Sequence, residues 1–182
     1  MSRHRATVGI VFLIVFIDLV GFGIVIPILP LYAEKFGPSP LTFGLLMASF
    51  SAMQLAAAPI LGRLSDRFGR RPVLLVSLVG SAVGYVMFGF AESMAVLFAS
   101  RIVDGISGGN IATAQAVIAD ITAPEDRARG MGMVGAAFGL GFICGPAMAA
   151  LLLPVAPWLP GVAAAAMSAT AFVLVLVVLP ET

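Results

Sequence analysis

Hydrophobic residues along the chain gather into six long stretches. A stretch of about 20 apolar residues is long enough for an α-helix to cross the hydrocarbon core of a bilayer. The stretches do not alternate apolar and polar residues, as the strands of a membrane barrel do. The predicted fold class is therefore all-α: a polytopic membrane protein with six transmembrane helices. These helices are expected at about 7–31, 41–62, 72–91, 95–119, 131–153 and 161–179.

The composition supports a lipid environment. Of the 182 residues, 60% are hydrophobic and only 10% are charged, with a mean hydropathy of +1.10. A soluble domain carries roughly 25% charged residues, and it needs polar surface to cover its core. The first apolar stretch is longer than the roughly 7–15 residues of a signal-peptide core and lacks an A-x-A cleavage site. It is predicted to be a retained membrane span.

Positive charge is concentrated on one side of the predicted membrane. The tail and the second and fourth joints together carry Arg3, Arg5, Arg63, Arg67, Arg70, Arg71, Arg127 and Arg129. In the opposite joints, Lys35 is the only lysine or arginine. Because positively charged loops stay in the cytoplasm, both termini are expected to be cytoplasmic, in a multi-pass protein of the inner (plasma) membrane.

Three ionisable residues fall inside the predicted spans: Asp18 in the first, and Arg101 and Asp104 in the fourth. Each costs roughly 2.5–3.5 kcal/mol at a helix centre, so such residues face a bundle interior or a hydrated cavity. Two interpretations remain open, a structural ion pair that locks helices together and a relay for protons or substrate. Arg101 does not release its proton. Its expected role is to hold a carboxylate or a water molecule and so change that group's proton affinity.

Polar residues in the fourth span share one helical face. Arg101, Asp104, Gly108, Ala112 and Gln115 follow at offsets of 3, 7, 11 and 14, which form one stripe at 3.6 residues per turn. The sixth span is almost wholly apolar. Helices 1, 2 and 4 are therefore expected to line the wet interior, and helix 6 to face lipid. The expected residues of a substrate cavity are Gln54, Asn110 and Gln115.

Histidine and cysteine chemistry is nearly absent. His4 and Cys144 are the single residues of their kinds, which excludes an internal disulfide, a histidine-based metal site and a catalytic triad. No enzymatic activity, cofactor, metal or nucleic-acid partner is expected.

Glycine recurs in the fifth span. Gly135 and Gly139 are four residues apart, as are Gly141 and Gly145, and Ala149 continues the second row. Small residues at this spacing allow helices to approach closely, and Pro146 tends to bend the helix. Simple packing and a role in gating both fit this pattern.

Four segments resemble the major facilitator superfamily, in particular its twelve-span drug/proton antiporter branch. "GRLSDRFGRRPVLL" resembles the signature loop between helices 2 and 3, with Gly62, Leu64, Asp66, Arg67, Gly69, Arg70 and Arg71 in step. "RIVDGISGG" resembles the fourth-helix motif, with Arg101 as its buried arginine and Gly105 following. "GLGFICGPAMAA" resembles the antiporter motif of helix 5 at Gly141, Gly145 and Pro146, with Ala149-Ala150 in place of a glycine pair. "DLVGFGIVIPILP" resembles the first-helix signature at Asp18, Gly21, Pro27 and Pro30, and "IADITAPEDRARG" is similar to the tetracycline-efflux subgroup.

The resemblance implies an N-terminal six-helix transmembrane domain over residues 1–182, built as 3+3 inverted repeats. It implies proton-coupled efflux of a small amphipathic drug such as a tetracycline. Asp18 is then the expected titrating carboxylate, Arg101 its electrostatic modulator, and Asp104 a substrate-side or pairing group.

The resemblance also implies a cytoplasmic gate. Arg70 is expected to meet Asp120 at the cytoplasmic end of helix 4, and Asp66 is expected to meet the other half of the transporter. The alternative is that the basic joint only fixes topology. The chain is expected to be a truncated half of a transporter that lacks its C-terminal six helices, or else a half that works as a pair of copies. Two other functions stay open: export of a sugar or metabolite, and a non-transporting fragment that assembles with a full-length relative.

Overall fold

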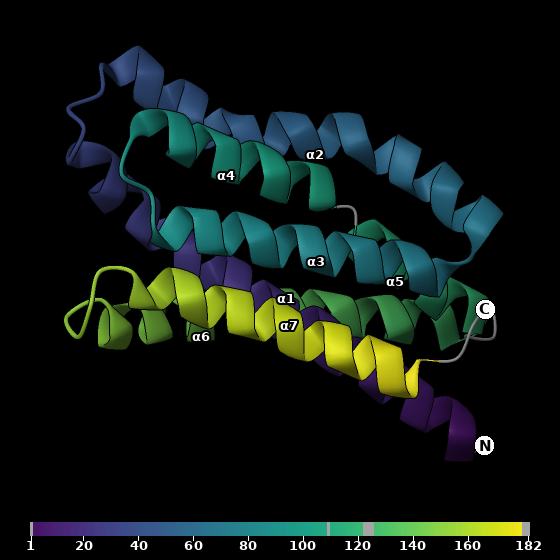
Figure 1. Ribbon diagram of the computed structural model, residues 1–182. Coiled ribbons are helices and arrows are strands. Elements are labelled where there is room, and N and C mark those ends of the chain that lie inside the picture. The colour runs from purple at the N-terminus through teal and green to yellow at the C-terminus, as the bar shows by residue number, and fades with distance from the viewer. Residues whose placement is uncertain (1, 109, 122–125, 180–182) are drawn as a thin grey trace.

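The fold was examined in a computed structural model, which describes residues 2–108, 110–121 and 126–179, without the side chains of residues 2–8, 10, 110–112, 114 and 121. All regular structure in these residues is helical (Figure 1), as the sequence predicted. The helices are α1 (Ser2–Glu34), α2 (Pro40–Phe68), α3 (Arg70–Gly89), α4 (Met94–Ser107), α5 (Asn110–Ile121), α6 (Arg127–Leu152) and α7 (Leu159–Val178). Five of them are long and apolar enough to cross a membrane.

The predicted fourth span is two helices. α4 ends at Ser107 and α5 begins at Asn110, so the expectation of one helix over 95–119 was wrong. Each Gly in a helix interior costs about 1 kcal/mol relative to Ala, and the sequence places Gly108 and Gly109 at this point. The Gly108 amide donates to the Gly105 carbonyl at 3.2 Å, and the Gln54 side chain donates to the Gly108 carbonyl at 2.9 Å. This break interrupts the polar stripe expected along the span.

The basic joint between α2 and α3 is helical rather than a loop. α2 continues to Phe68 and α3 begins at Arg70, so only Gly69 separates them. Gly69 has φ 95° and ψ 154°, a conformation that is almost confined to glycine. The apolar stretch covers only the thickness of the bilayer, whereas the backbone hydrogen bonds of a helix continue beyond it. The helices therefore extend past the predicted span boundaries at 62 and 72.

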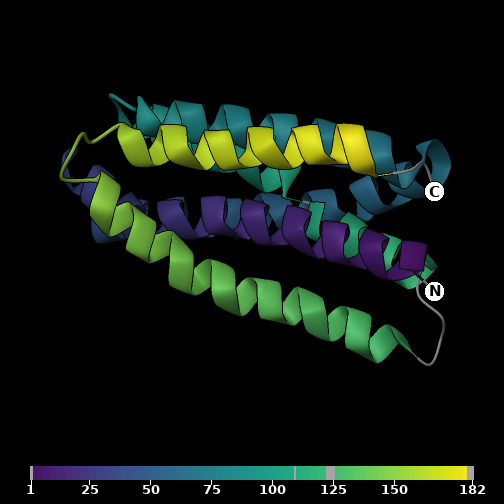
Figure 2. The same cartoon turned by 90° about the horizontal axis from the view of Figure 1, so that it is seen from below.

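The long helices run back and forth along one direction, and the two ends of the chain lie at the same end of the bundle (Figures 1 and 2). α1 packs chiefly on α6 and α7, α3 packs on α4 and α7, and α2 packs on α4. Two apolar clusters meet along α1 between Leu19 and Val20. This arrangement leaves polar side chains of α1, α2, α3 and α4 near the middle of the bundle.

One glycine row of α6 brings that helix against α1. A Cβ added at Gly23 would lie 2.8 Å from the Gly141 carbonyl oxygen and 3.3 Å from the Gly145 Cα. In contrast, a Cβ at Gly135 or Gly139 would have nothing within 4 Å among the described residues. The second row therefore forms the helix contact and the first row does not. Ala149 is buried in the same contact, so alanine at this place is compatible with close packing.

Candidate functional site

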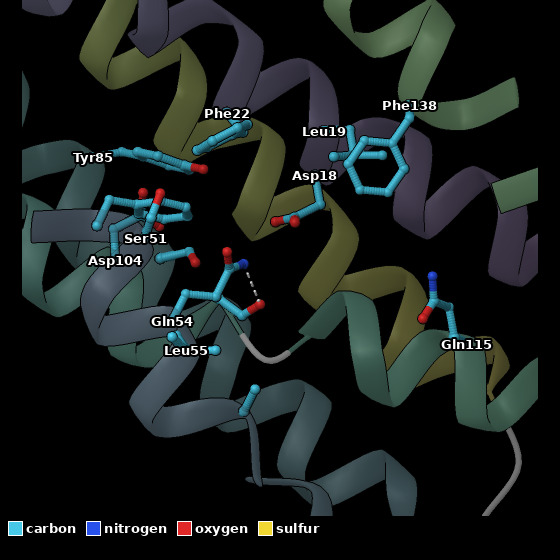
Figure 3. A pocket seen from close by; sticks show the side chains of 14 residues that line it. Asp18, Leu19, Phe22, Ser51, Gln54, Leu55, Tyr85, Asp104, Gln115 and Phe138 are labelled. Carbon is cyan, nitrogen blue, oxygen red and sulfur yellow. Dashed lines mark hydrogen bonds between the residues drawn. The ribbon is translucent and has the colours of Figure 1, made fainter. Parts of the chain in front are cut away.

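A cavity of about 570 Å³ opens among six of the helices (Figure 3). α1 contributes Asp18, Leu19 and Phe22, and α2 contributes Phe50, Ser51, Gln54, Leu55 and Ala58. The remaining lining residues are Ser81, Tyr85, Asp104, Gly108, Gln115 and Phe138. Most of this wall is apolar or aromatic, and its carboxylates are Asp18 and Asp104.

Asp18 is held at the junction of α1 and α7. Its carboxylate is buried and accepts a hydrogen bond from the Ser168 hydroxyl at 3.2 Å. Hydrogen bonds to an ionised group are stronger than neutral ones, so this contact orients the carboxylate as well as satisfying it. Ser168 itself is fully buried, which makes the sixth predicted span more than a lipid-facing helix.

Arg101 and Asp104 form a buried ion pair within one helix. Nη1 of Arg101 lies 3.2 Å from Oδ2 of Asp104, and both side chains are 2% exposed. Because the two residues are three apart on α4, this ion pair does not itself join two helices. α3 packs closely on α4 at this point, since a Cβ at Gly84 would lie 3.0 Å from the Asp104 Cβ.

The Arg101 guanidinium also lies among aromatic rings. Its centre is 5.5 Å from the Phe88 ring and 5.9 Å from the Phe50 ring, within the range of cation–π attraction. Nε and Nη2 of Arg101 are buried and have no hydrogen-bond partner in the part of the chain that the structure describes. Asp104 lines the cavity, whereas Arg101 is not among the lining residues.

The three residues predicted to line the substrate cavity differ in where the structure places them. Gln54 lines the cavity, but its amide is engaged by Gly108. Gln115 also lines it and stands apart from the group around Asp18 in Figure 3. The Asn110 side chain lies outside the described residues. α1, α2 and α4 supply lining residues as predicted, while none of the described lining residues comes from α7.

The contribution of α3 to the cavity was not predicted from the sequence. Ser81 and Tyr85 both line the cavity, and the fully buried Tyr85 lies within electrostatic range of Asp18, Asp104 and Arg101. The signal was available: Ser77, Ser81 and Tyr85 are spaced four apart and so share one face of a helix. A single hydroxyl group in an apolar stretch indicates a cavity-lining face less strongly than a charge does, because a serine in a helix can donate to the backbone of its own helix.

A second polar cluster lies at the ends of α2, α3 and α5. Nε of Arg70 lies 3.1 Å from Oδ2 of Asp120, the pairing expected from the sequence. Nη1 of Arg70 lies 2.7 Å from the Ser65 hydroxyl and 2.5 Å from Oδ1 of Asp66. One guanidinium thus ties three helix ends together.

Two further residues of this cluster bear on the expected gate. Asp66 was expected to find its partner outside the chain, and this stays a prediction. Within the described residues Asp66 pairs with Arg70 across the break at Gly69, and its side chain is still 65% exposed. Gly62 is not required by packing, since a Cβ there would have nothing within 4 Å among the described residues. Arg67 lies beside the Phe68 ring, at 5.3 Å.

The comparisons with known proteins agree with this arrangement. The sequence profile described as Major Facilitator Superfamily matches residues 11–182. This chain belongs to the major facilitator superfamily. Superfamily membership makes it a multi-pass membrane protein of a family whose members are transporters rather than enzymes.

Similar proteins carry the names of tetracycline resistance proteins and of a transporter. Tetracycline resistance protein, class G, of Vibrio anguillarum is 40% identical over 98% of this chain and 46% of the relative. Tetracycline resistance protein, class B, of Escherichia coli is 38% identical over 98% and 45%. The crystal structure of the human organic anion transporter MFSD10 (TETRAN) is similar with a TM-score of 0.86 and 35% identity, over 98% of this chain and 48% of that one.

These alignments also fix the extent of the similarity. The chain spans about half the length of the curated relatives that it matches. Only about half of each relative is therefore available for comparison with this cavity.

Proposed function

We propose that this chain supplies the N-terminal half of a proton-coupled antiporter that exports a small amphipathic drug of the tetracycline type. The observation that carries the proposal is the cavity in which two buried carboxylates, Asp18 and Asp104, stand in a largely apolar wall. The names of the tetracycline resistance relatives support the choice of substrate. The second half of the binding site comes from a C-terminal six-helix unit or from a second copy.

The chemistry of exchange follows from the carboxylates. A buried carboxylate is stabilised by either a proton or a bound cationic group, since each neutralises a charge that the low-dielectric wall disfavours. Proton and drug therefore compete for the same site, and each favours a different conformation of the transporter. In this scheme Asp18 carries the proton, and Arg101 sets the field at Asp104.

The aromatic wall suits a flat, ring-containing substrate. Phe22, Phe50, Tyr85 and Phe138 line the cavity. The Phe22 and Phe50 rings are 4.8 Å apart, centre to centre. Aromatic side chains present large apolar faces with little conformational freedom to lose, which favours binding of a rigid polycyclic molecule.

The proposal also gives the cluster around Arg70 a role. In this proposal the end of the bundle that carries the arginines of α2 and α3 faces the cytoplasm, because positively charged loops stay there. Both termini are then cytoplasmic and the protein lies in the inner membrane. The contacts of Arg70 with Asp66 and Asp120 would then form a gate that closes in one conformation and opens in the other. Gly62, Arg67, Gly69 and Arg71 belong to the same segment. Gly141 and Gly145 bring α6 against α1, and Pro146 follows them in the same helix.

The decisive experiment measures tetracycline accumulation in everted membrane vesicles that contain the protein in its full natural length. We expect accumulation with an imposed pH gradient and none after nigericin collapses it. Asp18→Asn keeps the size of the side chain but removes the titrating group. We expect it to reduce gradient-driven accumulation to the level of vesicles without the protein.

The matched control is Glu92→Gln, which neutralises an exposed carboxylate between α3 and α4. It should transport as the wild type does. Gradient-driven accumulation that survives in Asp18→Asn removes Asp18 from proton coupling, and no accumulation in the wild type contradicts the proposed function.

Export of an organic anion is a second candidate, favoured by the structural similarity to the human organic anion transporter. A labelled organic anion offered to the same vesicles distinguishes the two. If only the anion accumulates, the substrate class is not the tetracycline type.

A further inference from the structure

An apolar groove runs between α3 and α7 on the outer surface of the bundle. The two helices lie side by side in Figure 1 and pack extensively on each other. The groove has a volume of about 350 Å³ and eight lining residues, none of them polar. Its lining includes Leu78, Val79, Ala82 and Val86 of α3 and Ala169 and Phe172 of α7.

This groove is separate from the central cavity. The two share no lining residue among those described. The surface around the groove is exposed and apolar, with Val76 at 71% and Val177 at 74% exposed. In a protein whose outer solvent is lipid, such a surface faces the acyl chains of the bilayer.

One end of the groove leads to Arg71. Arg71, Leu75, Leu78 and Ala82 are spaced three and four apart along α3, so they form one stripe. Nη2 of Arg71 donates to the Leu176 carbonyl at 2.6 Å, and Leu176 lies one turn beyond Phe172 on α7. The guanidinium therefore bridges the same two helices that enclose the groove.

Arg71 differs from its neighbour Arg70 in its partners. Arg70 contacts two carboxylates, whereas no carboxylate in the described part of the chain pairs with Arg71. Nε of Arg71 is buried and also has no hydrogen-bond partner there. Arginine presents its donors as a planar fork that matches a phosphate. A cation with spare donors thus lies at the mouth of an apolar groove.

The distances suit a phospholipid. At 1.5 Å per residue, Leu78 lies about 10 Å and Val86 about 22 Å along α3 from Arg71. Half of the hydrocarbon core is about 15 Å thick. An acyl chain whose phosphate is at the level of Arg71 therefore reaches the near part of the groove, at Leu78 and Val79, within a single leaflet.

We propose that α3 and α7 bind one anionic phospholipid from the leaflet at the end of the bundle where the chain ends lie. The phosphate is bound by Arg71, and one acyl chain lies in the part of the groove nearest to it. The excess of arginine over carboxylate at this joint favours an anionic over a zwitterionic headgroup, because basic pockets between membrane helices recognise anionic lipids. The site is independent of the proposed transport function.

A purely structural role for Arg71 makes a different prediction. Arginine near a helix end stabilises the last carbonyls, and Arg71 does this at Leu176. Arg71→Gln retains a side-chain donor for that carbonyl and loses the charge. It therefore separates the two roles.

The test is native mass spectrometry of the purified full-length protein, titrated with phosphatidylglycerol or phosphatidylcholine. We expect one phosphatidylglycerol to bind more tightly than phosphatidylcholine. Arg71→Gln and Ala82→Trp, which fills the groove, should each weaken that binding about tenfold or more, as expected for the loss of a charge-assisted contact or of the acyl-chain site. Arg127→Gln at the same end and Ala48→Trp on exposed α2 are the matched controls and should bind as the wild type does.

Inorganic phosphate and tetracycline are added as competitors. Neither should displace the bound lipid. The proposal is overturned if phosphate displaces it, since the groove then contributes nothing, or if tetracycline displaces it, since the groove is then a drug site. It is also overturned if both lipids bind equally, or if Arg71→Gln binds as the wild type does.

Discussion

Two arginine–carboxylate pairs in this chain use the same chemical groups in opposite surroundings. Arg101 and Asp104 are 3.2 Å apart and each 2% exposed, whereas Arg70 and Asp120 are 3.1 Å apart and 17% and 45% exposed. The N–O distances are almost equal, so the two pairs differ in how exposed they are to water. A partner removed from a buried pair leaves a charge that water cannot reach, and the exposed pair can exchange its partner for water at little cost.

This difference separates a fixed site from a contact that can open. The pair on α4 is enclosed by rings of Phe50 and Phe88 and backs the cavity wall. The cluster around Arg70 lies where three helix ends meet and can dissolve into water. The second arrangement fits the proposed gate, and the first fits a permanent electrostatic feature of the cavity.

The largest effect is expected from Asp104→Ala. The substitution leaves Arg101 buried with its charge, because a guanidinium does not deprotonate. We expect a loss of about 3–5 kcal/mol in the free energy of unfolding, measured by sodium dodecyl sulfate titration in mixed micelles.

The double variant Arg101→Met with Asp104→Leu removes both charges and should recover most of that stability. A single variant as stable as the wild type would show that water reaches Arg101, which would remove the contrast between the two pairs.

The backbone at Gly69 is expected to matter more to the exposed cluster than its ion pairs do. Gly69→Ala forces a side chain into a conformation with φ 95°, at a cost of about 1–3 kcal/mol. Gly62→Ala is the control, because Gly62 is helical and a Cβ there would have nothing within 4 Å among the described residues. It should be neutral or slightly stabilising. Equal stabilities of the two alanine variants in the same titration would contradict the strained turn.

The smallest effect is expected from the ion pair of Arg70 with Asp120. A double-mutant cycle with Arg70→Gln and Asp120→Asn should give a coupling of about 0.2–1 kcal/mol, which falls as salt is raised. A salt-insensitive coupling of the size expected at Asp104 would mean that this cluster is buried in the membrane-embedded protein.

The helical membrane fold could be predicted from the sequence because a bilayer permits only structures that satisfy their own backbone, and long apolar stretches then become helices. The positive charges and the three intramembrane ionic residues were equally visible. The roles of these charged residues depend on their contact partners, which a hydropathy pattern does not show.

Only the tertiary structure decided those partners. In the folded chain Asp18 accepts a hydrogen bond from Ser168, 150 residues away. The Gly141–Gly145 row packs on α1 and the Gly135–Gly139 row does not, and a groove lies beside Arg71. The physical reason is that lipid is as apolar as a helix interior. A membrane helix is therefore hydrophobic on every face, and its sequence alone does not show which face meets a neighbour and which meets the bilayer.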